Sequence, residues 1–93
     1  MQVTCELYAT VRDAVGRQRV TRTVEAGATV RDLLRALGEE YDGVGPLVFD
    51  AEERVRANVN VLVNGEPIRS LDGPETELSD GDTLMVAPSV AGG

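Results

Sequence analysis

The sequence predicts an α+β fold, in which one main helix packs on one face of a mixed sheet of about four to five strands. Two kinds of segment predict it. Near both ends of the chain, apolar and polar residues alternate, which is the period of a half-buried strand. In the middle, apolar residues recur at helical spacing and form one stripe. The chain has 93 residues, so we expect one domain with an economical core.

The first third of the chain is predicted to form two strands joined by a short helix. The inward-facing residues of the first strand are Val3, Cys5, Leu7 and Ala9. Residues 10–16 follow as a helix of one or two turns that stops at Gly16, since glycine is typical of helix ends. A second strand lies within residues 17–27, where Arg22 interrupts the inward apolar face.

The main helix is predicted from Thr29 onward. Thr29 is suited to the N-cap position, and Asp32 three residues later completes a weaker form of the capping box. The apolar stripe consists of Val30, Leu33, Leu34, Leu37 and Tyr41. Gly38 lies inside this helix at a cost of roughly 1 kcal/mol relative to alanine. The sequence DGVGP, residues 42–46, is expected to end it.

The segment after the helix is less regular. Its apolar residues, which we expect to cover an edge of the core, are Leu47, Phe49 and Val55. Residues 58–63 alternate clearly as a strand, and Asn64-Gly65 is a strong turn signal. A loop with a short extended piece at residues 67–69 follows.

The last strand precedes the C-terminal tail. Leu84 and Val86 are predicted to face the core, and Met85 and Ala87 to face outward. We expect the tail to leave the sheet at Pro88, because proline cannot continue a central ladder.

This order of strands around one helix is typical of the β-grasp fold. In that fold the first and last strands lie parallel at the centre of the sheet, and the tail projects from its end. We therefore assign residues 1–88 to a β-grasp domain and residues 89–93 to a flexible tail that ends in Gly92-Gly93.

Charge and composition exclude several function classes. The net charge of −7 disfavours nucleic-acid binding and anionic membranes, and it favours a basic protein partner. The chain contains no histidine, so the commonest metal ligand and general base are missing. It also contains no lysine, and this acidic composition resembles that of halophilic archaea. Without a signal peptide or a long apolar segment, the expected location is the cytoplasm.

Four stretches of this sequence are familiar together: YATVRDAVG, GATVRDLL, VNVLVNGEPIR and LSDGDTLMVAPSVAGG. In this order they resemble the MoaD/ThiS family of ubiquitin-like sulfur carriers, and especially the small archaeal modifier proteins (SAMP). The resemblance covers nearly the whole chain. Many members end in Pro-Pro-x-x-Gly-Gly, whereas residues 87–93 here contain Pro88 as their one proline. This departure weakens assignment to the molybdopterin branch of the family.

The resemblance implies a carrier or modifier protein and not an enzyme. An E1-like enzyme would use ATP to adenylate the carboxylate of Gly93, and the chain would need no cofactor of its own. Sulfur would then convert the acyl adenylate to a thiocarboxylate, a sulfur donor for a molybdopterin precursor or a tRNA base. Alternatively, a lysine of a target protein would form an isopeptide bond. A monomer with a free tail suits this chemistry.

The two terminal glycines agree with that reading on physical grounds. A carboxylate is ionised at neutral pH and is a poor electrophile, so it must be activated in a partner's site that excludes water. Gly92 and Gly93 have no Cβ and adopt almost any backbone conformation, so they can enter a narrow channel.

Other features suggest docking or an alternative function. Met85, Ala87 and Leu62 are candidates for an exposed apolar docking patch, against the alternative of scattered apolar surface. Cys5 is expected to be a buried core thiol and not a sulfur acceptor. Two alternatives to a carrier remain open: a dedicated small subunit of molybdopterin synthase, bound to its large subunit, and a β-grasp binding module with an inert tail.

Overall fold

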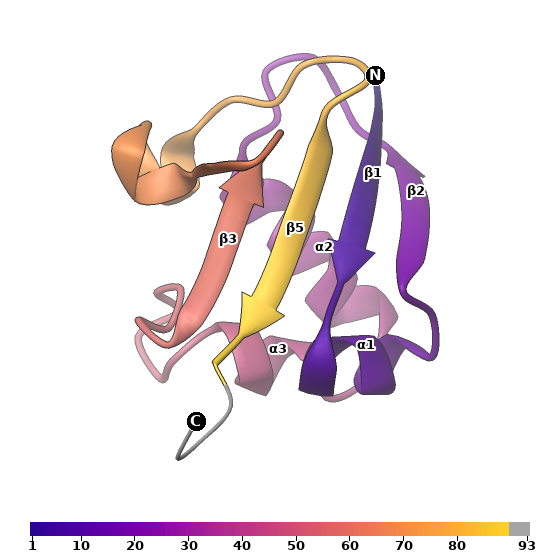
Figure 1. Ribbon diagram of the computed structural model, residues 1–93, viewed down its shortest axis with the longest axis vertical. Coiled ribbons are helices and arrows are strands. Elements are labelled where there is room, and N and C mark those ends of the chain that lie inside the picture. Colours follow the sequence, from indigo (N-terminus) through magenta and orange to yellow (C-terminus); the bar gives the residue numbers. More distant parts are fainter. Residues whose placement is uncertain (90–93) are drawn as a thin grey trace.

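A five-stranded mixed sheet with the order β2-β1-β5-β3-β4 forms one layer of the computed structural model, which describes residues 1–89 (Figure 1). The strands are β1 (Gln2–Leu7), β2 (Arg19–Thr23), β3 (Val59–Val63), β4 (Glu66–Pro67) and β5 (Thr83–Pro88). The first and last strands run parallel at the centre, and the other pairs are antiparallel. This topology confirms the predicted β-grasp fold.

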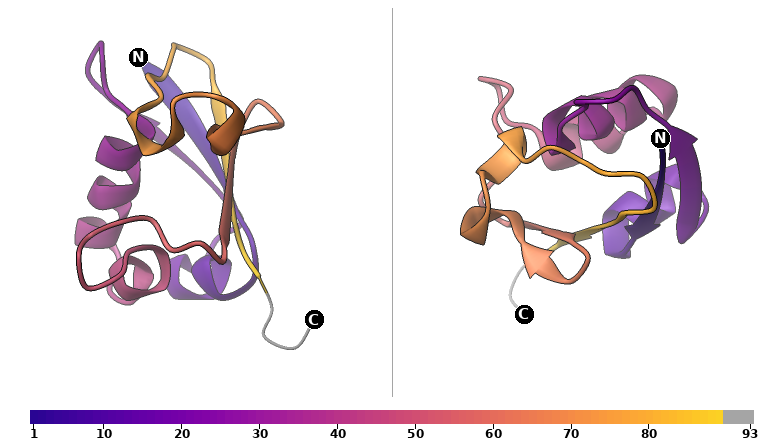
Figure 2. Two further views of the ribbon diagram at one scale, coloured as in Figure 1. Left: turned by 90° about the vertical axis from the view of Figure 1, so that its left-hand side faces the viewer. Right: turned by 90° about the horizontal axis from the view of Figure 1, so that it is seen from above.

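Three helices form the second layer and close one end of the molecule. They are α1 (Ala9–Val15), α2 (Val30–Glu40) and α3 (Val44–Val48). The long helix α2 lies behind the sheet, and the two short helices lie below it (Figures 1 and 2). Two short 3₁₀ segments, Ile68–Ser70 and Gly73–Glu75, follow β4. No helix in the described part of the chain is long and apolar enough to cross a membrane.

The core fills the space between the helices and one face of the sheet. The alternating strand residues and the stripe of α2 point into it as predicted, and its fully buried side chains include Val3, Cys5, Leu7, Val30, Leu34, Leu84 and Val86. Within residues 1–89, the opposite face of the sheet carries no helix (Figure 2).

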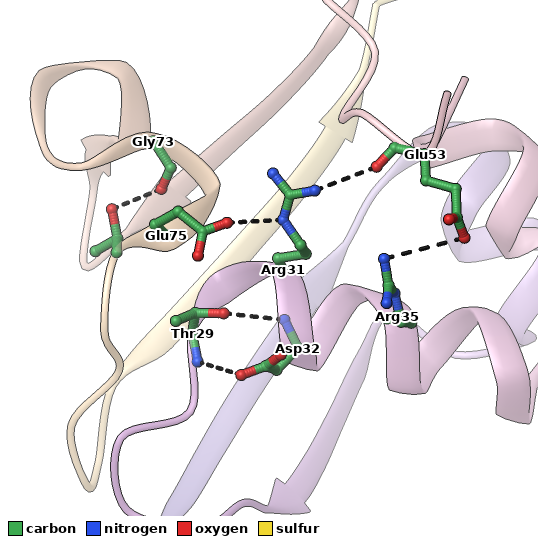
Figure 3. A network of polar contacts seen from close by, with 8 residues as sticks. Thr29, Arg31, Asp32, Arg35, Glu53, Gly73 and Glu75 are labelled. Carbon is green, nitrogen blue, oxygen red and sulfur yellow. Dashed lines mark hydrogen bonds and ion pairs between the residues drawn. The ribbon is translucent and has the colours of Figure 1, made fainter. Parts of the chain in front are cut away.

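The start of α2 is fixed by the predicted capping box. The Thr29 hydroxyl accepts the Asp32 N–H at 3.2 Å, and the Asp32 carboxylate accepts the Thr29 N–H at 3.0 Å (Figure 3). Arg31 on the first turn reaches two distant loops, through Glu75 at 2.9 Å and the carbonyl oxygen of Glu53 at 3.4 Å. The cap thus sets where the helix begins, and Arg31 ties that turn to the loops around it.

The segment after α2 differs from its prediction. Residues 44–48 form α3, and Val44 and Val48 are fully buried, whereas we expected DGVGP only to end the helix. A Cβ on Gly38 would lie 3.3 Å from the Cα of Gly45, so the missing side chain lets α3 approach α2 closely. Gly43, with a φ of 90°, reverses the chain between the two helices.

Two further expectations on the strands need correction. Ala9 was expected to face inward on the first strand, but β1 ends at Leu7 and Ala9 begins α1 with a φ of 53°. Pro88 was expected to leave the sheet, but it is the last residue of β5 and is paired with Val59.

The position of Pro88 is tolerated because its missing N–H is not needed. Successive residues of a strand point their N–H groups to opposite sides. The N–H of Ser89 points toward β3, where it donates to the carbonyl oxygen of Asn58 at 2.7 Å. The nitrogen of Pro88 therefore faces the other side, where the last residue of β1 to pair with β5 is Leu7.

Candidate functional site at the end of the central strand

The candidate site is built on the C-terminal end of β5, from which the tail continues. The N–H of Tyr8 donates to the carbonyl oxygen of Val86 at 3.1 Å on one side, and Ser89 donates to Asn58 on the other. Leu84 and Val86 are fully buried, so core packing also holds this strand. The predicted reactive residues, Gly92 and Gly93, lie outside the described residues.

The three predicted docking residues come together on the helix-free face of the sheet. Leu62 on β3 pairs with Met85 on β5, and Ala87 lies two residues further along β5. All three side chains are half-buried. The residues directly before and after Leu62 and Met85 on their strands point into the core. We call Leu62, Met85 and Ala87 the apolar patch, whose role in docking stays a prediction.

The strand register extends this patch into a row across the whole sheet. From one edge to the other, the residues of the row are Arg19, Glu6, Met85, Leu62 and Pro67. Arg19 and Glu6 form an ion pair at 2.6 Å. The charged side chains of the row are thus paired with each other, and its β5–β3–β4 part is apolar.

Tyr8 was not included among the predicted docking residues. It follows the last parallel pair, Leu7 with Val86, so it lies beside Ala87 at the edge of the apolar patch. The alternation along the first strand, which places even-numbered residues outward, was the signal that could have found it.

Two arginines near the patch were also missed. Arg56 and Arg69 line a groove between β3 and the segment after β4, together with Leu62 and Ala87. No local pattern brings these arginines together, because the 3₁₀ turn that positions Arg69 depends on the burial of Ile68.

Cys5 is placed as predicted, in the core. Its side chain is fully buried, and burial raises the pKa of the thiol from 9.0 to about 11, although the positive charge of Arg22 acts in the opposite direction. The thiol is therefore protonated at neutral pH and shielded from solvent, which excludes it as a sulfur acceptor in the folded protein.

Comparisons with known proteins agree with this architecture. The ThiS family matches residues 5–93. Over the full length of both chains, this chain is 46% identical to Small archaeal modifier protein 3 of Haloferax volcanii and 30% identical to the sulfur carrier protein CysO of Mycobacterium tuberculosis. These relatives are small modifier and carrier proteins, as predicted for this chain.

Solved structures give the same result. The crystal structure of SAMP1 from Haloferax volcanii superposes with a TM-score of 0.89 at 29% identity, with all of both chains covered. CysO in the BexX/CysO complex of Amycolatopsis orientalis superposes with a TM-score of 0.76 at 35% identity, covering 98% of this chain and 99% of the other. In sequence, in topology and in the order of its motifs, the chain belongs to the ThiS family of ubiquitin-like proteins.

Proposed function

We propose that this protein is a ubiquitin-like modifier and sulfur carrier whose reactive group is the α-carboxylate of Gly93. The observation that carries the proposal is the anchoring of β5 on both sides up to Ser89, directly before a tail that ends in Gly-Gly. Four residues span at most about 14 Å, so a partner that holds the carboxylate must also lie close to this end of the sheet.

The proposed chemistry takes place in a partner, because a carboxylate needs activation. A carboxylate oxygen of Gly93 attacks the α-phosphorus of ATP, and pyrophosphate leaves. Hydrosulfide then displaces AMP and loses its proton, which leaves a thiocarboxylate. Alternatively, the amine of a lysine displaces AMP and forms an isopeptide bond with loss of a proton. The chain itself has no histidine or lysine to act as the base.

The apolar patch is the proposed contact with the activating enzyme. Leu62 and Met85 alternate with buried core residues and so lie on the helix-free face of the sheet, and Ala87 is two residues before Ser89. A partner bound over these residues covers the strand that leads into the tail. The BexX/CysO complex, in which a similar carrier is bound to another protein, supports docking to a protein partner.

The test is a comparison of the wild-type chain with a variant that lacks Gly92 and Gly93, each tagged at the N-terminus and produced in the source cells. On a denaturing blot, a modifier gives a ladder of larger species that disappears with the truncation. A sulfur carrier gives an intact mass with sulfur in place of one C-terminal oxygen. The proposal is wrong if the full-length protein shows neither result, and the inert-tail alternative is then favoured.

A further inference from the structure

The groove between β3 and the segment after β4 carries positive charge in an acidic protein. Its volume is about 540 Å³, and the residues that line it include Arg56 and Arg69 but no Asp or Glu. Most of its other lining residues are apolar, and among them Leu62 and Pro67 are half-buried. The groove therefore combines an apolar floor with two cations.

Most arginines of the described chain are already paired with an acidic side chain. Six of the nine lie within 4.0 Å of a carboxylate: Arg12, Arg19, Arg22, Arg31, Arg35 and Arg54. Within residues 1–89, Arg56 and Arg69 have no such partner, although the Nε of Arg56 donates to the carbonyl oxygen of Pro46 at 2.9 Å. Their charges are therefore available to a carboxylate from another molecule.

A second groove has acidic residues as well as arginines in its lining. It lies between α2 and the segment that follows α3, with Arg35 and Phe49 in its lining. Its lining contains three acidic residues, Glu39, Asp50 and Glu53, and two arginines, Arg35 and Arg56, so Arg56 borders both grooves. The groove that Arg56 shares with Arg69 has no acidic residue in its lining, and Arg69 does not line the second groove.

The cationic groove adjoins the proposed reactive end of the chain. Asn60 and Ala87 line it and are paired across β3 and β5. Asn58 lies two residues before Asn60, and Ser89 lies two residues after Ala87. The N–H of Ser89 donates to the carbonyl oxygen of Asn58. The groove therefore lies at the end of the sheet from which the tail continues.

We propose that this groove docks a segment of the activating enzyme that carries an apolar side chain next to a carboxylate. This inference rests on the proposed function, and it adds which kinds of side chain on the activating enzyme contact this groove. A net charge of −7 repels an acidic segment over most of the surface, so two unpaired arginines beside an apolar floor specify where it binds. The acidic composition of the whole chain favours a basic partner, whereas the two arginines of this groove favour an acidic segment.

The experiment measures ATP–pyrophosphate exchange by the E1-like enzyme as a function of the concentration of this protein. Arg69→Glu is expected to raise KM about tenfold, with kcat changed by less than about twofold, because the contact positions the protein and does not react. Arg56→Gln is expected to raise KM by a smaller factor. For the wild type, KM should also rise with ionic strength, and this dependence should weaken in both variants.

The matched control is Arg17→Glu. Arg17 is exposed, has no acidic partner in the described residues and does not line the groove, and its reversal changes the net charge as much as Arg69→Glu does. Equal KM values for Arg17→Glu and Arg69→Glu, in proteins with unchanged thermal unfolding, overturn the inference but leave the proposed function intact. No exchange with the wild-type protein contradicts the proposed function itself, and the docking inference with it.

Discussion

Leu62 of β3 lies directly opposite Met85 of β5 on the helix-free face of the sheet, and Glu6 of β1 lies on the other side of Met85. Leu62 and Met85 are therefore central in the sheet and half-exposed, and Met85 lies on β5, the strand that leads to the tail. A polar residue at this pair should disturb a partner more than it disturbs the fold.

Leu62→Asp is predicted to weaken activation of the protein without unfolding it. Burial of a leucine side chain at an interface contributes about 1.5–3 kcal/mol, so KM in the pyrophosphate exchange assay should rise by tenfold or more. Thr21→Asp, on the exposed edge strand β2, is the control and should leave KM near the wild-type value. Equal effects of the two substitutions would show that the apolar patch is not the contact.

Thr29→Ala is predicted to lower the free energy of unfolding by about 1 kcal/mol, because the Asp32 N–H loses its acceptor at the start of α2. Urea unfolding followed by circular dichroism measures the change. Thr29→Ser retains the hydroxyl and should recover most of the stability. If the serine and alanine variants are equally destabilised, the effect comes from lost packing of the threonine methyl group and not from the cap.

Stability is predicted to fall in acid partly through Glu40. Hydrogen bonds from Arg22, at 2.8 and 2.6 Å, hold the pKa of the Glu40 carboxyl below its ordinary value of 4.5. A carboxyl whose pKa is lower in the folded state stabilises the fold above its unfolded pKa, and this stabilisation is lost as the pH falls through the folded pKa. Glu40→Gln should therefore give a shallower loss of stability below about pH 4.5.

The pH dependence is measured by urea unfolding between pH 7 and pH 3. Asp50 contributes in the same direction, because backbone N–H groups of Arg54 and Glu52, both at 2.9 Å, lower its pKa from the ordinary 3.8. Some acid sensitivity should therefore persist in Glu40→Gln. Parallel curves for the wild type and Glu40→Gln would contradict the predicted contribution of Glu40.

Cys5 is predicted to resist alkylation in the folded protein. The thiol is fully buried and its pKa is about 11, so iodoacetamide at pH 8 should label it only after unfolding in guanidinium chloride. Peptide mass mapping locates the label. Any alkylation of the native, sulfur-loaded protein should then map to the C-terminal thiocarboxylate. Rapid labelling of Cys5 in the folded state would contradict its placement in a closed core.

Local chemistry in the sequence determined the elements that were predicted correctly. The capping box of Thr29 and Asp32 and the alternation of residues 59–63 each depend on side chains a few positions apart. The turn at Asn64-Gly65 has φ values of 52° and 86°, which these two residue types adopt most readily. Such features can be read without knowledge of the fold. The terminal Gly-Gly likewise led to the proposed function from sequence alone.

The tertiary structure decided what depends on residues that are distant in the chain. Five residues are too few for α3 to show a helical period. Val44 and Val48 are buried where α3 packs on the rest of the fold, and the missing side chain of Gly38 permits its close approach to α2. Arg56 and Arg69 meet at one groove because the chain turns twice between them, through β3 and β4. Short-range patterns encode secondary structure, whereas packing between distant segments decides which charges stay unpaired on the surface.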